Sequence, residues 1–207
     1  LCQGKAIINS INLENGLERF EKVAPLVKKY GAAVVVGLID EQGMALTRQR
    51  KLEVAERCYY LLVKKYGLAP VDLIFDPLTF PVGTGDKKYL GSAVETIEGL
   101  RLIKTRFPEC KTILGISNVS FGLPTAGREV LNAVFVYLNT LAGLDYAIVN
   151  TEKLVRYATI PEQERKLAED LLLHTSEQTL KDFIDFYREK KPAGPTDQRE
   201  QTLPLEQ

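Results

Sequence analysis

The chain has 207 residues, of which 45% are hydrophobic and 26% charged, and this is enough for one globular domain with a substantial core. Because 27 basic residues balance 27 acidic ones, no net charge attracts nucleic acid or an anionic membrane surface. No apolar run approaches the roughly 20 residues that span a bilayer, and the first residues lack the pattern of a signal peptide, so we predict a cytoplasmic protein.

Few residues are available for metal or thiol chemistry. Cys2, Cys58 and Cys110 are widely spaced and form no C-x-x-C pattern, which indicates reduced, structural thiols. His174 is the only histidine, so we expect neither a histidine-rich metal site nor a Ser-His-Asp or Cys-His relay elsewhere in the chain. The sequence therefore predicts no metal site.

Short apolar segments rich in β-branched residues alternate with helical patterns along the chain. The segments expected as strands are 6–8, 32–39, 71–75, 112–116 and 146–149. The patterns expected as helices are 17–30, 47–67, 94–103, 128–142, 162–173 and 179–190. Gly31 is expected to end the first helix and Thr47 to cap the second. The apolar stripe of that second helix is expected at Leu52, Ala55, Tyr59 and Leu62.

The strands start every 28 to 40 residues or so, and each is followed by a helix, which is the period of βαβ units in a parallel sheet. Five such units are fewer than the eight of a closed barrel. We therefore expect residues 1–190 to be the last five units of a (β/α)₈ TIM barrel, with 191–207 as a linker or tail. An open five-stranded sheet of flavodoxin type is the alternative.

Polar side chains follow the predicted strands, where ligands bind in parallel α/β sheets. These strand ends carry Asn9-Ser10, Asp40-Glu41, Asp76, Ser117-Asn118 and Asn150-Thr151. Amides offer donors and acceptors together, so the set favours a neutral, planar ligand rich in nitrogen and oxygen. The Asp76 carboxylate could accept two parallel N–H bonds from a guanidine-like edge, each contributing roughly 1.5–3 kcal/mol.

Three segments carry a family resemblance: 6–12 (AIINSIN), 76–80 (DPLTF) and 115–122 (GISNVSFG). From about Gly4 to Leu173, the chain resembles the pterin-binding domain of cobalamin-dependent methionine synthase. It is more distantly similar to corrinoid iron–sulfur protein methyltransferase and to dihydropteroate synthase. The resemblance implies a (β/α)₈ barrel of the pterin-binding type, which binds methyltetrahydrofolate at the carboxyl ends of its strands. It also implies that the tail leads toward a cobalamin-binding domain.

The resemblance assigns roles to particular residues. Asp76 would bind the pyrimidine edge of the pterin, and Asn9 would hydrogen-bond the same ring. Asn118 matches the family asparagine that approaches the methyl-bearing N5, and Ser117 beside it is expected to contact the substrate. Arg128 resembles a family residue near the folate that orients the asparagine's loop.

Asn9 and Asn12 are alternative candidates for one role in ring binding. We choose Asn9, because it directly follows the predicted strand, and expect Asn12 to be a turn or cap residue. Two further polar positions of the family would lie before Leu1, so the chain alone is expected to be an incomplete and inactive site.

The activity implied is methyl transfer from methyltetrahydrofolate to cob(I)alamin, in methionine synthesis from homocysteine. N5 must be protonated at or before transfer, because the leaving nitrogen anion is otherwise too basic. We hypothesise that the Asn118 carbonyl oxygen accepts a hydrogen bond from the protonated N5. Cobalamin would come from another domain or protein.

Three alternatives to this activity remain. One is a methyltransferase that serves a corrinoid iron–sulfur protein. Another is a non-catalytic domain that binds pterin or docks a corrinoid protein. Dihydropteroate synthase is disfavoured, since its strand-seven lysine and its strand-eight arginine–histidine pair do not appear.

Overall fold

The computed structural model describes residues 3–189 as alternating strands and helices. The strands are β1 (Ile7–Ile11), β2 (Ala33–Gly37), β3 (Ile39–Asp40), β4 (Gly43–Met44), β5 (Leu73–Asp76), β6 (Lys111–Gly115) and β7 (Tyr146–Ile148). The α-helices are α1 (Glu18–Tyr30), α2 (Arg48–Tyr59), α3 (Ser92–Arg106), α4 (Thr125–Leu141), α5 (Glu162–Leu173) and α6 (Glu177–Glu189). The short helical segments are η1 (Tyr60–Lys65), η2 (Pro70–Asp72), η3 (Lys87–Tyr89), η4 (Ile116–Ser120), η5 (Thr151–Lys153) and η6 (Tyr157–Thr159).

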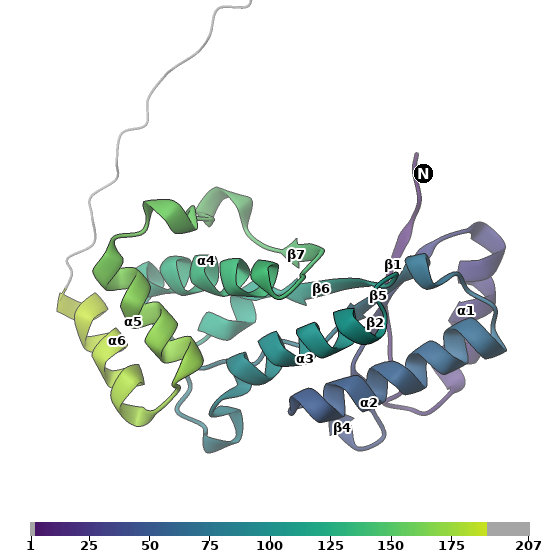
Figure 1. The fold of residues 1–207 in the computed structure, drawn as a ribbon, viewed down its shortest axis with the longest axis horizontal. Helices are drawn as coiled ribbons and strands as arrows, with labels where there is room; N and C mark the ends of the chain where they lie inside the picture. Colours follow the sequence, from purple (N-terminus) through teal and green to yellow (C-terminus); the bar gives the residue numbers. More distant parts are fainter. Residues whose placement is uncertain (1–2, 190–207) are drawn as a thin grey trace, which may run out of the picture.

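The main sheet is parallel throughout, and its strands follow one another in the order β1-β2-β5-β6-β7. Figure 1 shows these strands crossing the middle of the molecule beside helices α2, α3 and α4. This sequential order is that of a (β/α)₈ barrel, whereas a flavodoxin-type sheet has the order 2-1-3-4-5. The fold is the curled half-barrel that the sequence predicts, and the flavodoxin-type alternative is excluded.

Alternate residues of the inner strands face two different environments. Val34 and Val36 pair with Leu73 and Phe75, and all four belong to a core shared with α1 and α2. On the other face, Ala33, Val35 and Ile74 form a small cluster with Ile113 packed against it. This second face is the concave side of the half-barrel.

A second large core lies between the end of the sheet and helices α3 to α6. Its buried side chains include Leu114 of β6, Phe135 of α4, Leu171 of α5 and Phe183 of α6. Gly127 lets α4 and α6 approach closely, because a Cβ atom there would lie 2.7 Å from the Phe183 ring. This packing fixes the beginning of α4 against the rest of the domain.

Several helix ends agree with the sequence. Gly31 ends α1 with φ of 63°, and the Thr47 side chain caps α2 by accepting from the Arg50 N–H at 3.3 Å. His174 lies at the exposed end of α5, while Cys58 and Cys110 are free and buried. The expected ends of these elements are confirmed.

Other details of the elements were predicted incompletely or wrongly. The predicted stripe of the second helix is confirmed but incomplete: Ala55 and Leu62 are buried in the core and Leu52 and Tyr59 pack against it. The prediction missed Lys51, Val54 and Cys58, which are also buried. The α-helix ends at Tyr59, and the following turn η1 is π-helical. The hairpin of β3 and β4 was missed, since two-residue strands carry no alternation. Helix α4 begins at residue 125, directly after a proline, rather than at residue 128.

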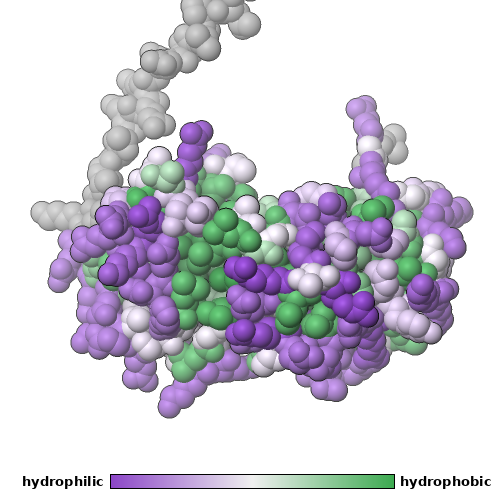
Figure 2. All heavy atoms as spheres, viewed as in Figure 1, coloured by the Kyte–Doolittle hydropathy of each residue, from purple (hydrophilic) through white to green (hydrophobic). Residues whose placement is uncertain are grey.

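The outer strands of the sheet expose apolar side chains. Ile7 of β1 is 55% exposed, and Tyr146 and Ile148 of β7 are 45% and 51% exposed. Figure 2 shows apolar side chains gathered over the region where α4 and β7 lie in Figure 1. Within residues 3–189, no helix has the length and apolar character needed to cross a membrane. The tail predicted at 191–207 lies outside the described residues, so that boundary stays a prediction.

Candidate functional site

A cavity of about 510 Å³ opens on the concave side, at the carboxyl ends of β5, β6 and β7. This volume falls within the roughly 300–1,000 Å³ typical of small-molecule sites. Asp76 and Asn118 are its two polar side chains from strand ends. The other residues that line it are Met44, Leu78, Thr79, Phe80, Pro81, Tyr89, Gly115, Phe121 and Ile148. The structure therefore brings together two of the residues that the sequence assigns to pterin binding.

Asp76 ends β5 and directs its carboxylate into this cavity. Its Oδ1 accepts from the Leu78 N–H at 2.9 Å, and no hydrogen bond within residues 3–189 engages its Oδ2. Burial raises the pKa of Asp76, and the Leu78 N–H and the nearby Lys51 ammonium oppose that rise. The carboxylate therefore keeps acceptor capacity for the N–H groups of a ligand.

The turn after Asp76 is held in a conformation that side chains rarely adopt. Leu78 has φ of 65°, in the left-handed region, which costs a residue other than glycine about 1–2 kcal/mol. The buried Thr96 hydroxyl of α3 donates to the Leu78 carbonyl at 2.9 Å. With the bond from Leu78 N–H to Asp76, this contact fixes both ends of the strained residue, a feature common at ligand sites.

Lys51 of α2 also supports the turn that follows Asp76. Its side chain is fully buried, and its Nζ donates to the Ala45 carbonyl at 2.8 Å and the Pro77 carbonyl at 2.5 Å. The ammonium also lies 4.9 Å from the centre of the Phe80 ring. Burial lowers the pKa of Lys51 to about 7, and the Asp76 carboxylate opposes the shift. The hydrogen bonds of Lys51 thus tie α2 to the segment that carries Asp76.

Asn118 reaches the cavity from η4, the turn that follows β6. A Cβ atom on Gly115 would lie 3.6 Å from the Asn118 Nδ2, so the amide folds back over the end of its own strand. The Arg128 Nε donates to the Ser120 Oγ at 3.2 Å, and that hydroxyl donates to the Ser117 carbonyl at 3.1 Å. Arg128 therefore steadies the turn that presents Asn118.

Aromatic and apolar side chains form the remaining walls of the cavity. Phe80 stacks on Tyr89 with ring centres 5.5 Å apart and planes inclined by 15°. Met44, Phe121 and Ile148 are 46%, 63% and 51% exposed. A flat ring can therefore lie against an apolar wall while the cavity stays open to a second reactant.

The first strand places its asparagines differently from the prediction. β1 continues to Ile11, so Asn9 lies inside the strand opposite Val35, and the prediction that the strand ends before Asn9 was wrong. Asn9 pairs with Val35, whose side chain lies on the concave face, and Asn9 itself is exposed. Asn12 follows the strand, and its Oδ1 accepts from the Glu14 N–H at 3.2 Å, as expected of a turn residue. Asn9 does not line the cavity, and its contact with the ring stays a prediction.

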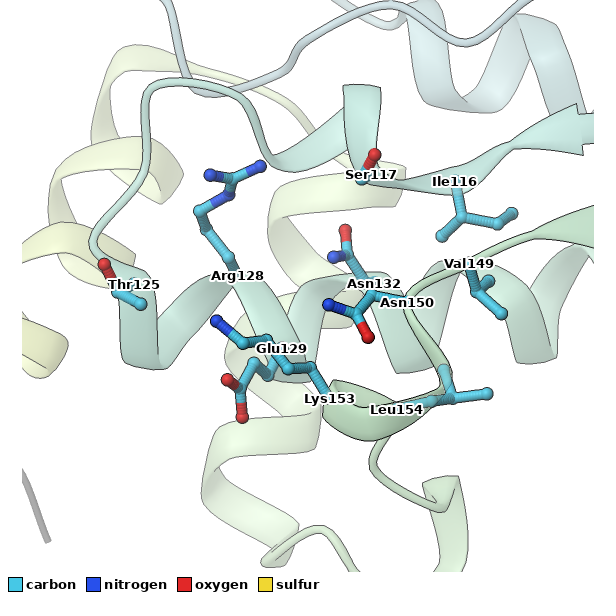
Figure 3. Close-up of a pocket in the computed structure, with 10 residues that line it drawn as sticks. All are labelled: Ile116, Ser117, Thr125, Arg128, Glu129, Asn132, Val149, Asn150, Lys153 and Leu154. Carbon is cyan, nitrogen blue, oxygen red and sulfur yellow. The ribbon is translucent and has the colours of Figure 1, made fainter. Parts of the chain in front are cut away.

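Ser117 and Arg128 line a separate cavity of about 260 Å³ between α4 and the end of β7 (Figure 3). The structure therefore does not bring them to the same pocket as Asp76.

The Asp40-Glu41 pair does not line the cavity of Asp76 either, because both carboxylates form ion pairs with α2. Asp40 pairs with Arg50, and Glu41 pairs with Arg57 at 2.6 Å.

Comparison with known proteins adds the decisive observation. A family model described as pterin binding enzyme matches residues 1–150. The chain belongs to the pterin-binding enzyme family. Over 172 residues, it is 44% identical to methionine synthase of Mycobacterium tuberculosis (strain ATCC 25618 / H37Rv) and 43% identical to methionine synthase of Mycobacterium leprae (strain TN). These matches cover 82% of this chain but 14% of each relative.

Three residues that line or support the cavity of this pterin-binding enzyme were not predicted from the sequence. Lys51, Phe80 and Tyr89 each contribute to the cavity or its support, yet none stands at a strand end. Lys51 shares the helical spacing of Val54 and Cys58, which could have revealed that it faces the core. The stacking of Phe80 on Tyr89 depends on the course of a loop, for which the sequence carries no comparable signal.

Proposed function

We propose that this chain is the methyltetrahydrofolate-binding module of a cobalamin-dependent methyltransferase that makes methionine from homocysteine. The pterin lies in the cavity of Asp76 and Asn118, and its N5-methyl group faces the open mouth. The proposal rests most directly on the pairing of these two side chains in one apolar-walled cavity of a pterin-binding enzyme. Their chemistry matches the two edges of a pterin.

Asp76 suits the pyrimidine edge of the ring. That edge presents a ring N–H and an exocyclic amine side by side, and a carboxylate accepts both in parallel. The free Oδ2 and the remaining lone pair of Oδ1 provide the acceptors, while the Leu78 N–H fixes the carboxylate plane. When it is protonated, the nearby Lys51 offsets the charge of the buried carboxylate.

Asn118 suits the reacting nitrogen. An N5 anion is a poor leaving group, so methyl transfer requires a proton on N5. An amide oxygen accepts a hydrogen bond from protonated N5 and favours that cationic form without removing the proton. Water delivers the proton at the open mouth, since no histidine lines the cavity.

Cobalamin, bound by its own domain, supplies the nucleophile that takes the methyl group. This chain contributes the approach route, because Met44, Phe121 and Ile148 leave the mouth of the cavity exposed. Their apolar surfaces suit contact with the flat face of a large ring. The final methyl acceptor is homocysteine in this proposal.

Binding of methyltetrahydrofolate by the full-length protein tests the proposal. Asp76→Asn should weaken binding by roughly 10- to 150-fold, since each charge-assisted bond contributes about 1.5–3 kcal/mol. Isothermal titration measures this change. Asp182→Asn, an exposed carboxylate on α6, is the matched control and should bind as the unaltered protein does.

Methyl transfer to supplied cob(I)alamin separates the possible activities. Transfer followed by homocysteine methylation supports the proposal. Transfer only to a corrinoid iron–sulfur protein would identify the alternative methyltransferase, and binding without any transfer would identify a scaffold. Unchanged affinity in Asp76→Asn would contradict the proposed pterin site.

A further inference from the structure

A second cavity beside the pterin site has polar groups that the proposed pterin contacts do not use. Its volume is about 260 Å³, and Figure 3 shows the side chains that surround it. They come from the end of β6, the first turns of α4, and the segment that joins β7 to η5. The polar residues that line it are Ser117, Thr125, Arg128, Glu129, Asn132, Asn150 and Lys153.

The cations of this cavity are available to a ligand. Within residues 3–189, neither Arg128 nor Lys153 has a carboxylate within ion-pair distance. Arg128 uses its Nε for Ser120, which leaves its terminal nitrogens as donors. Figure 3 shows Arg128 and Lys153 on the same side of the cavity. With the single carboxylate of Glu129, the lining carries a net positive charge that favours an anion.

The amides of the cavity add a second requirement. The Asn132 Oδ1 is buried and has no hydrogen-bond partner in the described part of the chain. The Asn150 Oδ1 accepts from the Glu152 N–H at 3.1 Å, so its Nδ2 remains a donor toward the cavity. A buried acceptor without a partner is unfavourable, so a donor from a ligand would be favoured there. A fitting ligand therefore combines a negative group with an N–H donor.

The two cavities meet along the same strand ends. Asn118 lines the pterin cavity while its neighbour Ser117 lines the second one. On β7, Ile148 lines the first cavity and Val149 the second. In a pterin, N5 is bonded to C6, and in a folate C6 carries the p-aminobenzoyl-glutamate tail. A ring bound with N5 at Asn118 therefore directs its C6 substituent toward Ser117.

We propose that the second cavity binds the glutamyl end of the folate, an inference that rests on the proposed function. The carboxylate pairs with Arg128 and Lys153, whose charged groups lie on the same side of the cavity. The amide N–H that joins p-aminobenzoate to glutamate donates to the Asn132 Oδ1. Longer glutamyl chains add carboxylates within reach of the same cations. The second cavity then selects the tail, and the first selects the ring.

Two ligands separate the tail from the ring in titrations of the full-length protein. One is methyltetrahydrofolate with one or three glutamates, and the other is an N5-methylated tetrahydropterin whose C6 substituent is a single methyl group. The unaltered protein should bind the tailed ligands at least 10-fold more tightly. Lys153→Met should remove roughly 10-fold of affinity for the tailed ligands and none for the tail-less pterin. Lys166→Met, an exposed lysine of α5, should change neither.

Asn132→Asp provides a second, nearly isosteric variant. It places a negative charge where the amide oxygen stands, so it should weaken triglutamate binding more than monoglutamate binding. Equal affinity of the unaltered protein for tailed and tail-less ligands would overturn the tail site and leave the proposed function intact. Equal losses for both ligands in Lys153→Met would overturn it too. Failure of every ligand to bind would overturn the tail site and the proposed function together.

Discussion

The two cavities at the carboxyl ends of the strands differ in what lies behind their polar groups. Asp76 ends an interior strand, and the fully buried Lys51 and Thr96 hold the backbone that follows it. Lys153, by contrast, is exposed on a short turn after the outer strand β7. Rigid support suits a site that must hold reacting atoms, whereas an exposed turn suits a ligand end of variable length.

Removing the Asn118 amide should produce the largest effect in this comparison. Asn118→Ala should lower the rate of methyl transfer by roughly 10²-fold, because the protonated N5 loses its acceptor. The affinity for methyltetrahydrofolate should change only a few-fold. Single-turnover transfer to cob(I)alamin and a binding titration measure the two quantities. Gln163→Ala on α5 should leave both unchanged, and an unaltered transfer rate in Asn118→Ala would move the chemistry away from this residue.

The buried support of Asp76 predicts a pH dependence of stability. Burial lowers the pKa of Lys51 to about 7, whereas the unfolded chain binds that proton up to about 10.5. Between these values the unfolded state holds more protons, so the free energy of unfolding should rise with pH, by up to about 1.4 kcal/mol per unit from this residue. Denaturant unfolding of Lys51→Met should lack this contribution, while Lys166→Met should retain it. Equal slopes in all three proteins would refute it.

The strained turn predicts a smaller effect. Thr96→Val keeps the side-chain shape but removes the bond to the Leu78 carbonyl, so it should lower the free energy of unfolding by about 1 kcal/mol. Binding of methyltetrahydrofolate should weaken a few-fold because the Asp76 turn loosens. Thr105→Val is the control on the same helix, since its hydroxyl donates to the Arg101 carbonyl at an exposed position. Equal effects of the two changes on binding would deny Thr96 a positioning role.

Salt should distinguish the cavities with the mildest change. The exposed cation of the second cavity is screened by added salt, whereas the buried Lys51 is screened much less. Raising potassium chloride from about 0.05 to about 0.5 M should lower the affinity for triglutamylated methyltetrahydrofolate severalfold. The tail-less pterin should lose little. Parallel losses for both ligands would remove the distinction.

The sheet is predicted well because its strands are apolar on both faces. Val34, Val35 and Val36 alternate between two packed environments, so this run favours a buried parallel strand whatever its register. The end of β1 is harder to predict. A polar residue after an apolar run usually marks the end of a strand, but Asn9 is polar and lies within β1.

The residues around the cavity are only partly visible in the sequence. Asp76 and Asn118 follow apolar strands directly, and this position marks them. The spacing of Lys51 with Val54 and Cys58 indicates the buried side of α2, but it does not indicate the contacts of Lys51 with the Ala45 and Pro77 carbonyls. Arg128 acts through Ser120, eight residues away, which no local pattern encodes. Such links depend on tertiary packing rather than on periodicity.

The position of bound methyltetrahydrofolate tests the central claim most directly. A crystal structure of the full-length protein with this ligand should place the pyrimidine N–H groups about 2.7–3.2 Å from the Asp76 carboxylate oxygens. The N5 atom should face the Asn118 amide, and the glutamate should reach Arg128 and Lys153. A pterin ring bound outside the cavity between β5 and β7 would contradict the account.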